Sequence, residues 1–304
     1  YSDCRIGLSP DKFILDYCDR ALGITSAEEK YILPSGNNFS LYLIELFPHQ
    51  VWKMEMTDGI RQALQEGSDS LRAYYEKAGI LVARPAKGSS CTLAVSAKGG
   101  NNAENHNDIG SYAVALGKCT MVGDQGGPFS YPGDYFSAEA PEKYKIKGSF
   151  GHPVPVVDGK TQSSGAKASA IVLKKEFTDV KDLLSIDYTS AYSTPSLDKL
   201  VRTFVYDRQE KGSFTVGDEF TANAPIRFET AITTQANWKI IDDTHLLLTT
   251  GTEQMTVTIE ASGKVAFTSE TIEVNSPAYT RIGISLKEQS KDGYIRLTMR
   301  TKQL

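Results

Sequence analysis

The sequence predicts a mainly β protein, with a large layered antiparallel β-sandwich preceded by a short helical segment. Strand-like runs of alternating apolar and polar residues follow one another closely through most of the chain. Turn signals separate several of these runs, among them DG at 158–159 and KDG at 291–293. Helical periodicity is confined to the first part, so we expect a helical segment over 1–78 and a β-sandwich domain over 79–304.

The helical segment has recognisable start and stop signals. Ser9 is an N-cap candidate, and Pro10 follows at the first helical position. Apolar side chains then recur every four residues, at Ile14, Cys18 and Leu22. Ser26 and Glu29 have the spacing of a capping box. The stretch SLRAYYEKAG, residues 70–79, is predicted to be a last helical turn that ends at its glycine.

The predicted strands begin with ILVARP and CTLAVSAK, the second of which alternates apolar and polar residues. CTMVGD, residues 119–124, is another strand candidate. Further candidates lie at 111–117, 153–158, 168–175, 199–206, 213–220, 225–234, 246–250, 254–260, 264–270, 280–287 and 293–301. Residues 123–144 are rich in glycine and proline and predict a long surface loop, the type of segment that often carries function.

Composition excludes some classes of function. The 304 residues carry a formal charge of −4, which argues against nucleic acid as the main partner. No apolar run approaches the length of a membrane span, so none is expected. The four cysteines show no CxxC spacing and predict no zinc knuckle. The chain opens on Tyr1 without a basic-then-apolar leader, and we expect it to be a processed or excised piece.

Polar chemistry is concentrated in KGGNNAENHNDIGSY, residues 98–112. Glu104, His106 and Asp108 alternate there, so an extended backbone would point all three side chains to one side. Two carboxylates and an imidazole on one face of a sheet are costly unless a partner satisfies them. A divalent cation does so, and so does a polar substrate.

Two further residues complete a candidate metal site with His106. Asp124 ends a strand candidate and His152 begins HPVPVVDG, so three strands would supply two histidines and one aspartate. This ligand set suits zinc with an open coordination position. The alternative is a hydrogen-bonded polar cluster that fixes a loop, with asparagines capping turns. In that case the glycines need only positive φ, and Asp158 and Gln162 need no role beyond a hairpin turn and its surroundings.

Three motifs in order, GGNNAENHNDIGSY, GDQGG and GHPVPVVDGKTQ, resemble the C-terminal part of the heparinase II/III-like family of polysaccharide lyases. The resemblance covers residues 70–235 and is diffuse in the last 70 residues. It implies an α/α toroid before the antiparallel sheets, of which residues 1–78 would be the tail. It also implies cleavage of uronate-containing polysaccharides by β-elimination, an acidic polysaccharide as partner, and a periplasmic or extracellular location.

The resemblance assigns roles to particular residues. The zinc ligands of the family match His106, Asp124 and His152. Glu104 stands where the family usually has a histidine that helps catalysis. Glu104 is therefore the candidate catalytic residue, or else a sign that this protein no longer cuts. The catalytic tyrosine of the family, and the group that neutralises the substrate carboxylate, usually come from the toroid.

Four other residues are candidates for contact with a sugar. Lys98 offers a positive charge beside the motif, with a solvated lysine as the alternative, and Asn105 lies within the motif. Tyr131 and Tyr135 are candidates for the catalytic tyrosine because of their exposed position in the predicted loop, with packing or contact with a sugar as the alternative for both.

Three functions stay open at this point. The first is the C-terminal portion of a polysaccharide lyase, and the second is a non-catalytic carbohydrate-binding or scaffold module with a structural metal. The third is a β-sandwich interaction domain without such a site. A complete lyase site must neutralise the uronate carboxylate, remove the C5 proton and protonate the leaving oxygen at C4.

Overall fold

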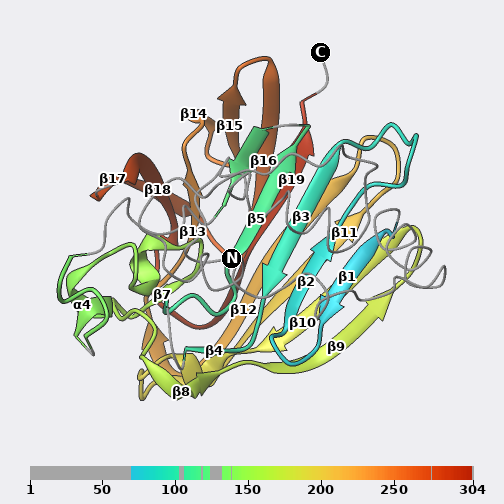
Figure 1. Ribbon diagram of the computed structural model, residues 1–304. Helices are drawn as coiled ribbons and strands as arrows, with labels where there is room; N and C mark the ends of the chain where they lie inside the picture. Colours follow the sequence, from blue (N-terminus) through green and yellow to red (C-terminus); the bar gives the residue numbers. More distant parts are fainter. Residues whose placement is uncertain are drawn as a thin grey trace, which may run out of the picture. The chain divides into compact units, whose positions relative to one another are not determined.

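The computed structural model (Figure 1) describes residues 70–102, 106–117, 119–123, 132–137, 139–274 and 276–302. The helices predicted over residues 1–69 lie outside the described residues, and the domain limit at 78/79 stays a prediction. In the described part the prediction of a mainly β fold with large antiparallel sheets is confirmed. No helix in this part is long and apolar enough to cross a membrane.

The largest sheet has eight strands among the described residues, all paired antiparallel. Its strands lie in the spatial order β14 (Asn237–Asp242), β15 (His245–Thr250), β16 (Glu253–Ala261), β19 (Ser290–Thr301), β12 (Ser213–Ile226), β11 (Leu197–Asp207), β10 (Lys181–Asp187) and β9 (Ile171–Phe177). Strands from distant parts of the sequence therefore lie side by side, most clearly β19 between β16 and β12.

Three smaller sheets complete the described part. The five-stranded sheet has the order β1 (Arg72–Tyr75), β2 (Ile80–Ala83), β3 (Leu93–Lys98), β5 (Tyr112–Leu116) and β6 (Cys119–Val122). The four-stranded sheet has the order β17 (Val265–Val274), β18 (Ser276–Leu286), β13 (Phe228–Thr234) and β7 (Val156–Val157). A two-stranded sheet joins β4 (Asn101–Asn102) to β8 (Gly165–Ser169). The short helical elements are α4 (Ala140–Lys143), η1 (Ser149–Gly151) and η2 (Thr189–Ala191).

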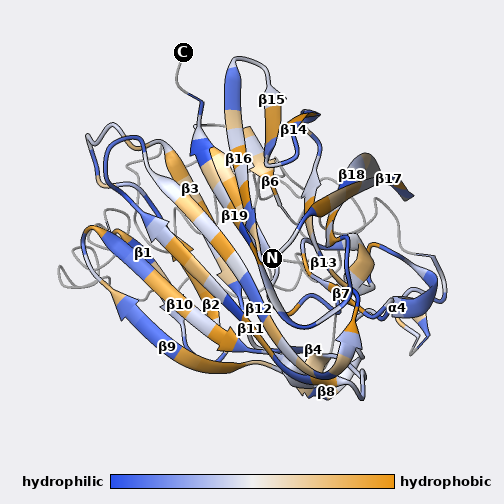
Figure 2. Cartoon of the chain, turned by 180° about the vertical axis from the view of Figure 1, so that it is seen from behind, coloured by the Kyte–Doolittle hydropathy of each residue, from blue (hydrophilic) through white to orange (hydrophobic). Residues whose placement is uncertain are grey.

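The five-stranded and eight-stranded sheets pack face to face on a shared apolar core. Apolar and polar side chains alternate along the strands, as the bands of colour in Figure 2 show. Tyr112 of β5 contacts Phe204 and Phe214 of the larger sheet, with ring centroids 6.4 and 5.9 Å apart. The hydroxyl of Tyr206 donates to the Leu93 carbonyl across the same interface. The core thus fixes the position of β5, which follows the histidine-bearing segment.

Two sequence-based expectations about local structure are wrong. Residues 70–79 do not form a helical turn, because Arg72–Tyr75 form β1 and pair with β2. The turn that follows ends at Gly79, whose φ is +64° and whose backbone packs against Gly100. KDG at 291–293 does not form a turn but lies within β19, opposite β12. In both cases pairing with a distant strand outweighs the local signal.

Other turn and loop expectations agree with the structure. Asp158 and Gly159 have φ values of 50° and 76°, as a tight turn at DG requires. The predicted loop over 123–144 contains the single-turn helix α4 near its end, and its residues 124–131 lie outside the described residues. Four strands had no matching strand prediction: β1, β4, β10 and β14.

Candidate functional site

The structure brings His106 and His152 together from segments far apart in the sequence. His106 lies in the irregular segment between β4 and β5, and His152 directly follows η1. Their side chains are buried, at 1% and 0% exposed, and the ring centroids are 5.2 Å apart with the rings tilted by 51°. Two buried imidazoles at this distance can share a cation or a hydrogen-bonded partner.

Tyr135 is the third aromatic residue at this site. Its hydroxyl lies 3.1 Å from Nε2 of His106, and its side chain is fully buried. The expected exposed position is wrong for Tyr135, and the alternative of packing is confirmed, because Tyr135 packs in a small core with Ile146 and Tyr279. The ammonium of Lys147 donates to the Tyr135 carbonyl at 2.6 Å and lies 4.9 Å from the centre of its ring.

Lys98 and Asp108 form an ion pair with each other. The Asp108 carboxylate is buried and the Lys98 side chain is 14% exposed, so the alternative of a solvated lysine is wrong. Residues 106–110 form no strand, and the alternating face expected for His106 and Asp108 is not built there. A role for Lys98 in binding substrate stays a prediction.

Four of the predicted site residues lie outside the described residues. These are Glu104, Asn105, Asp124 and Tyr131. The predicted meeting of Asp124 with the two histidines therefore stays a prediction, and so does the catalytic role of Glu104. Within the described ranges, no group of three His, Cys, Asp or Glu residues is placed to hold a metal ion.

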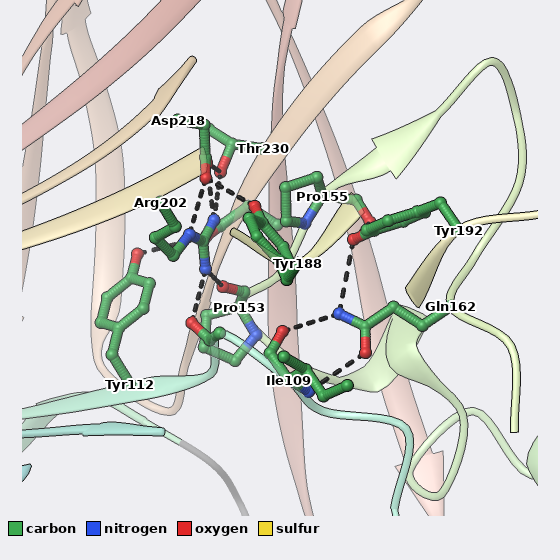
Figure 3. A network of polar contacts seen from close by, with 12 residues as sticks. Ile109, Tyr112, Pro153, Pro155, Gln162, Tyr188, Tyr192, Arg202, Asp218 and Thr230 are labelled. Carbon is green, nitrogen blue, oxygen red and sulfur yellow. Dashed lines mark hydrogen bonds and ion pairs between the residues drawn. The ribbon is translucent and has the colours of Figure 1, made fainter. Parts of the chain in front are cut away.

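Gln162 holds the segment that follows His106. Its amide nitrogen donates to the Ile109 carbonyl at 2.7 Å, and its amide oxygen accepts from the Ile109 N–H at 3.0 Å (Figure 3). The same oxygen accepts from the Asn102 side chain, and the Gln162 N–H donates to the Ser149 hydroxyl of η1. Through its side chain and its backbone N–H, Gln162 thus ties together the two histidine-bearing segments, and it has a larger structural role than the sequence suggested.

Arg202, which was not among the residues predicted from the sequence, makes a second tie between these segments. Its Nη1 donates to the Gly110 carbonyl at 2.7 Å and to the Pro153 carbonyl at 2.8 Å. Nε and Nη2 bind the two oxygens of Asp218 at 2.7 and 2.6 Å. The hydroxyls of Tyr188 and Thr230 also donate to this carboxylate, both at 2.7 Å. We call Arg202, Asp218, Tyr188 and Thr230 the Arg202 cluster.

A signal for the Arg202 cluster was present in the sequence. Arg202 lies two residues from both Leu200 and Phe204 along β11, so the pattern directs all three side chains to the inward face. Asp218 occupies the same kind of position on β12 and is the cross-strand partner of Arg202. Opposite charges at inward positions of two adjacent predicted strands indicate a buried ion pair.

Burial and charge set the protonation states in this cluster. Burial raises the pKa of Tyr188 well above its ordinary value, so its hydroxyl stays protonated and donates to Asp218. Burial alone lowers the pKa of Arg202, but the Asp218 carboxylate raises it, and the net shift of the pKa is upward. The cluster therefore keeps a charged guanidinium beside Asp218.

The described residues include some of the groups that a zinc site needs. The two histidines supply two ring nitrogens from independent segments. A histidine that binds a metal through one nitrogen uses the other for a hydrogen bond that fixes its orientation. The Tyr135 hydroxyl is placed to be that partner for His106. The residues present thus fit a metal site, with its third ligand left to a residue beyond the described ranges.

Comparison with known proteins shows the fold. No family model and no curated protein matches the sequence. The crystal structure of heparinase III matches with a TM-score of 0.60 at 15% identity, over 77% of this chain and 37% of that chain. Heparan sulfate lyase HepC from Pedobacter heparinus matches with a TM-score of 0.62 at 14% identity, over 89% of this chain and 43% of that chain.

The chain spans less than half the length of these two lyases. At identities this low the likeness concerns the fold, and the activity of the lyases is not transferred with it. The resemblance stated from the three motifs is confirmed at that level. The described part of this chain has a heparinase III-like fold.

Proposed function

We propose that the chain is part of a polysaccharide lyase that cleaves uronate-containing glycans by β-elimination. The observation that supports this most directly is the buried pair of His106 and His152, with Tyr135 beside it, in a heparinase III-like fold. The proposed substrate is an acidic polysaccharide, and the proposed location is periplasmic or extracellular. Both belong to the proposal because the lyases of similar fold are much longer than this chain.

The proposed cofactor is one zinc ion held by His106, Asp124 and His152. When bound, it would supply a fixed positive charge that crosslinks the segments carrying these residues. The histidines are almost fully buried, which suits metal ligands better than groups that touch a polymer. Tyr135 would hold the ring of His106 in the orientation that ligation requires.

The proposed chemistry needs more groups than the described residues contain. A base must take the C5 proton and an acid must protonate the C4 oxygen, and we assign one of these roles to Glu104. Lys98, Asn105 and Tyr131 are the proposed contacts to the glycan. The residues that neutralise the uronate carboxylate are expected from the part of a longer protein that corresponds to the toroid.

A second candidate function is a non-catalytic carbohydrate-binding module with a structural metal. Glu104, in the place of a histidine that helps catalysis in the family, favours it. A carboxylate there would also repel an acidic substrate. This candidate predicts retention of glycan without cleavage.

The two candidates are separated by incubation with heparan sulfate, chondroitin sulfate and alginate. A lyase releases unsaturated uronate ends that absorb in the ultraviolet, and Glu104→Gln should abolish their release while glycan binding persists. Asn223→Ala, a change at an exposed position on β12, is the control and should leave product release unchanged. Glycan retention without any product, from both this chain and a longer form that carries the toroid, would establish the binding module instead.

The metal is tested separately by elemental analysis of the purified chain. We expect one zinc per chain, lost in His106→Ala and in His152→Ala. Tyr135→Phe should keep the fold and weaken zinc binding by about 10- to 100-fold, the usual effect of removing a partner of a ligating histidine. Absence of any bound divalent ion from the unaltered chain would remove the zinc proposal.

A further inference from the structure

We propose that Arg202 is a positioning residue of the histidine site. By joining the segment of His106 to the segment of His152, its guanidinium sets the distance between the two imidazoles. The inference deepens the proposed function because it concerns the same site. Its basis is the geometry of the described residues, which is independent of the metal and of the reaction.

The contacts are made by a single nitrogen atom. Nη1 of Arg202 has two hydrogens, and it donates one bond to the Gly110 carbonyl and one to the Pro153 carbonyl, at 2.7 and 2.8 Å. Gly110 follows His106 by four residues, and Pro153 is the next residue after His152. One atom therefore bridges two backbone segments close to both histidines, and Figure 3 shows Arg202 between Pro153 and Asp218.

The position of this nitrogen is itself fixed. Asp218 binds the Nε–Nη2 edge of the guanidinium through two parallel hydrogen bonds. Thr230 accepts a third bond from Nη2 at 3.0 Å. Since the guanidinium is planar, two bonds to one carboxylate determine where Nη1 lies. Both charged side chains are at most 1% exposed. The rigid core of the eight-stranded sheet thus dictates the spacing of two loop segments.

Gly110 supports the same conclusion. Its φ is +86°, a conformation that side chains other than glycine rarely adopt. A β-carbon at this position would lie 3.4 Å from Cδ of Arg202. The backbone at Gly110 therefore lies directly against the arginine side chain that binds its carbonyl.

Arg208 provides a matched control for Arg202, because a change there shows the effect of disturbing a buried arginine that has a structural role alone. Arg208 is also buried and also pairs with a buried carboxylate, that of Asp182. Its other contacts are the carbonyls of Arg84 and Leu71, which lie in segments that carry neither histidine. Substitution of Arg208 by lysine thus disturbs a comparable ion pair without touching the histidine-bearing segments.

The experiment compares Arg202→Lys with Arg208→Lys in the full chain. Lysine can keep a charge beside the carboxylate but lacks the planar fork that reaches two carbonyls as well. The first readout is the imidazole NMR signals of the four histidines, assigned by single His→Gln variants. The second is the affinity for zinc, measured by competition with a chelator.

We expect Arg202→Lys to shift the signals of His106 and His152 but not that of His245, which lies on β15. Zinc affinity should fall by about 10- to 100-fold, as for other residues that orient ligating histidines. Arg208→Lys should leave both readouts unchanged, whatever it does to stability. Because Gln162 ties the same segments independently, we expect Arg202→Lys to fold.

Equal effects of the two lysine variants on the histidine signals, or unchanged signals in Arg202→Lys, would overturn the proposal. If the unaltered chain binds no zinc, the zinc proposal fails, while the NMR signals still decide the role of Arg202. Should Arg202→Lys not fold, Thr230→Val serves instead, because it removes one anchor of the guanidinium while keeping both charges. It should then shift the same two histidine signals by less, and an unchanged spectrum would again refute the proposal.

Discussion

Two buried arginines in this chain use the same ion-pair chemistry for different ends. Arg202 pairs with Asp218 inside the eight-stranded sheet and extends to the two segments that carry His106 and His152. Arg208 pairs with Asp182, which also accepts from Arg72, and we call these three residues the Arg208 cluster. The Arg208 cluster connects the strands β1 and β2 to β10, and its hydrogen bonds do not reach the segments of His106 and His152.

The carbonyl partners of a buried guanidinium determine which part of the molecule it holds in place. Both arginines satisfy a carboxylate, and both have nitrogens left over for backbone carbonyls. In the Arg202 cluster these carbonyls belong to loops, which lie outside the strand ladders. In the Arg208 cluster they flank strands, whose positions the ladders already determine. The first arginine is therefore expected to affect the site, and the second to affect stability alone.

The largest difference is expected on removal of the carboxylates. Asp218→Asn leaves the charge of Arg202 fully buried without its counterion, and we expect it to lower the free energy of unfolding by about 3–5 kcal/mol. Asp182→Asn should cost less, because the Arg72 side chain is 23% exposed and can turn to water. Urea denaturation of both variants checks this order. Equal costs would show that the two clusters are equally cut off from solvent.

The next effect is expected at two glycines, Gly110 in contact with Arg202 and Gly212 four residues after Arg208. Gly110 and Gly212 both have positive φ, so alanine should cost about 1–2 kcal/mol at either position. At Gly212 a β-carbon would also lie 2.4 Å from the sulfur of Cys91, which adds about 1–3 kcal/mol of overpacking. Thermal and urea unfolding should therefore rank Gly212→Ala as the less stable variant. Only Gly110→Ala should move the signals of His106 and His152, and movement in Gly212→Ala would break the contrast.

Tyrosine hydroxyls sharpen the comparison further. Tyr188 donates to the charged Asp218, and Tyr206, whose ring lies under Arg208, donates to the neutral Leu93 carbonyl. A hydrogen bond to a charged group contributes about 1.5–3 kcal/mol and one to a neutral group about 0.5–1.5 kcal/mol. Tyr188→Phe should thus destabilise the chain more than Tyr206→Phe in urea unfolding. The reverse order would mean that Asp218 is satisfied without Tyr188.

The smallest effect on stability is expected from the exposed, hydrogen-bonded pair of Asp242 and His245. The Thr244 N–H, the His245 imidazole and the Thr244 hydroxyl lower the pKa of Asp242 to about 2. A lowered pKa in the folded state favours folding above the ordinary value of 3.8, and that contribution is lost as pH falls through the folded value. Because solvent screens this pair, the loss should be slight in acid unfolding. An NMR titration should find the low pKa, and Thr244→Ala should raise it; an ordinary pKa in the unaltered chain would contradict the contact.

Much of the fold followed from periodicity. Most of the predicted strands exist, because alternation of apolar and polar residues reflects which side chains a sheet buries. The errors at residues 70–79 and at 291–293 arose where a short local signal opposed pairing with a distant strand. Register with β2 and β12 decided those segments, and register is a property of two strands together.

For the site, residue types alone singled out His106 and His152, since histidines among glycines, asparagines and carboxylates are costly without a partner. Alternation also places Arg202 and Asp218 on inward faces of adjacent strands. What only the tertiary structure decided is which loops these charges hold. Two hydrogen bonds from Arg202 go to the backbone carbonyls of Gly110 and Pro153. Because every residue has a backbone carbonyl, the sequence does not indicate which ones Arg202 binds.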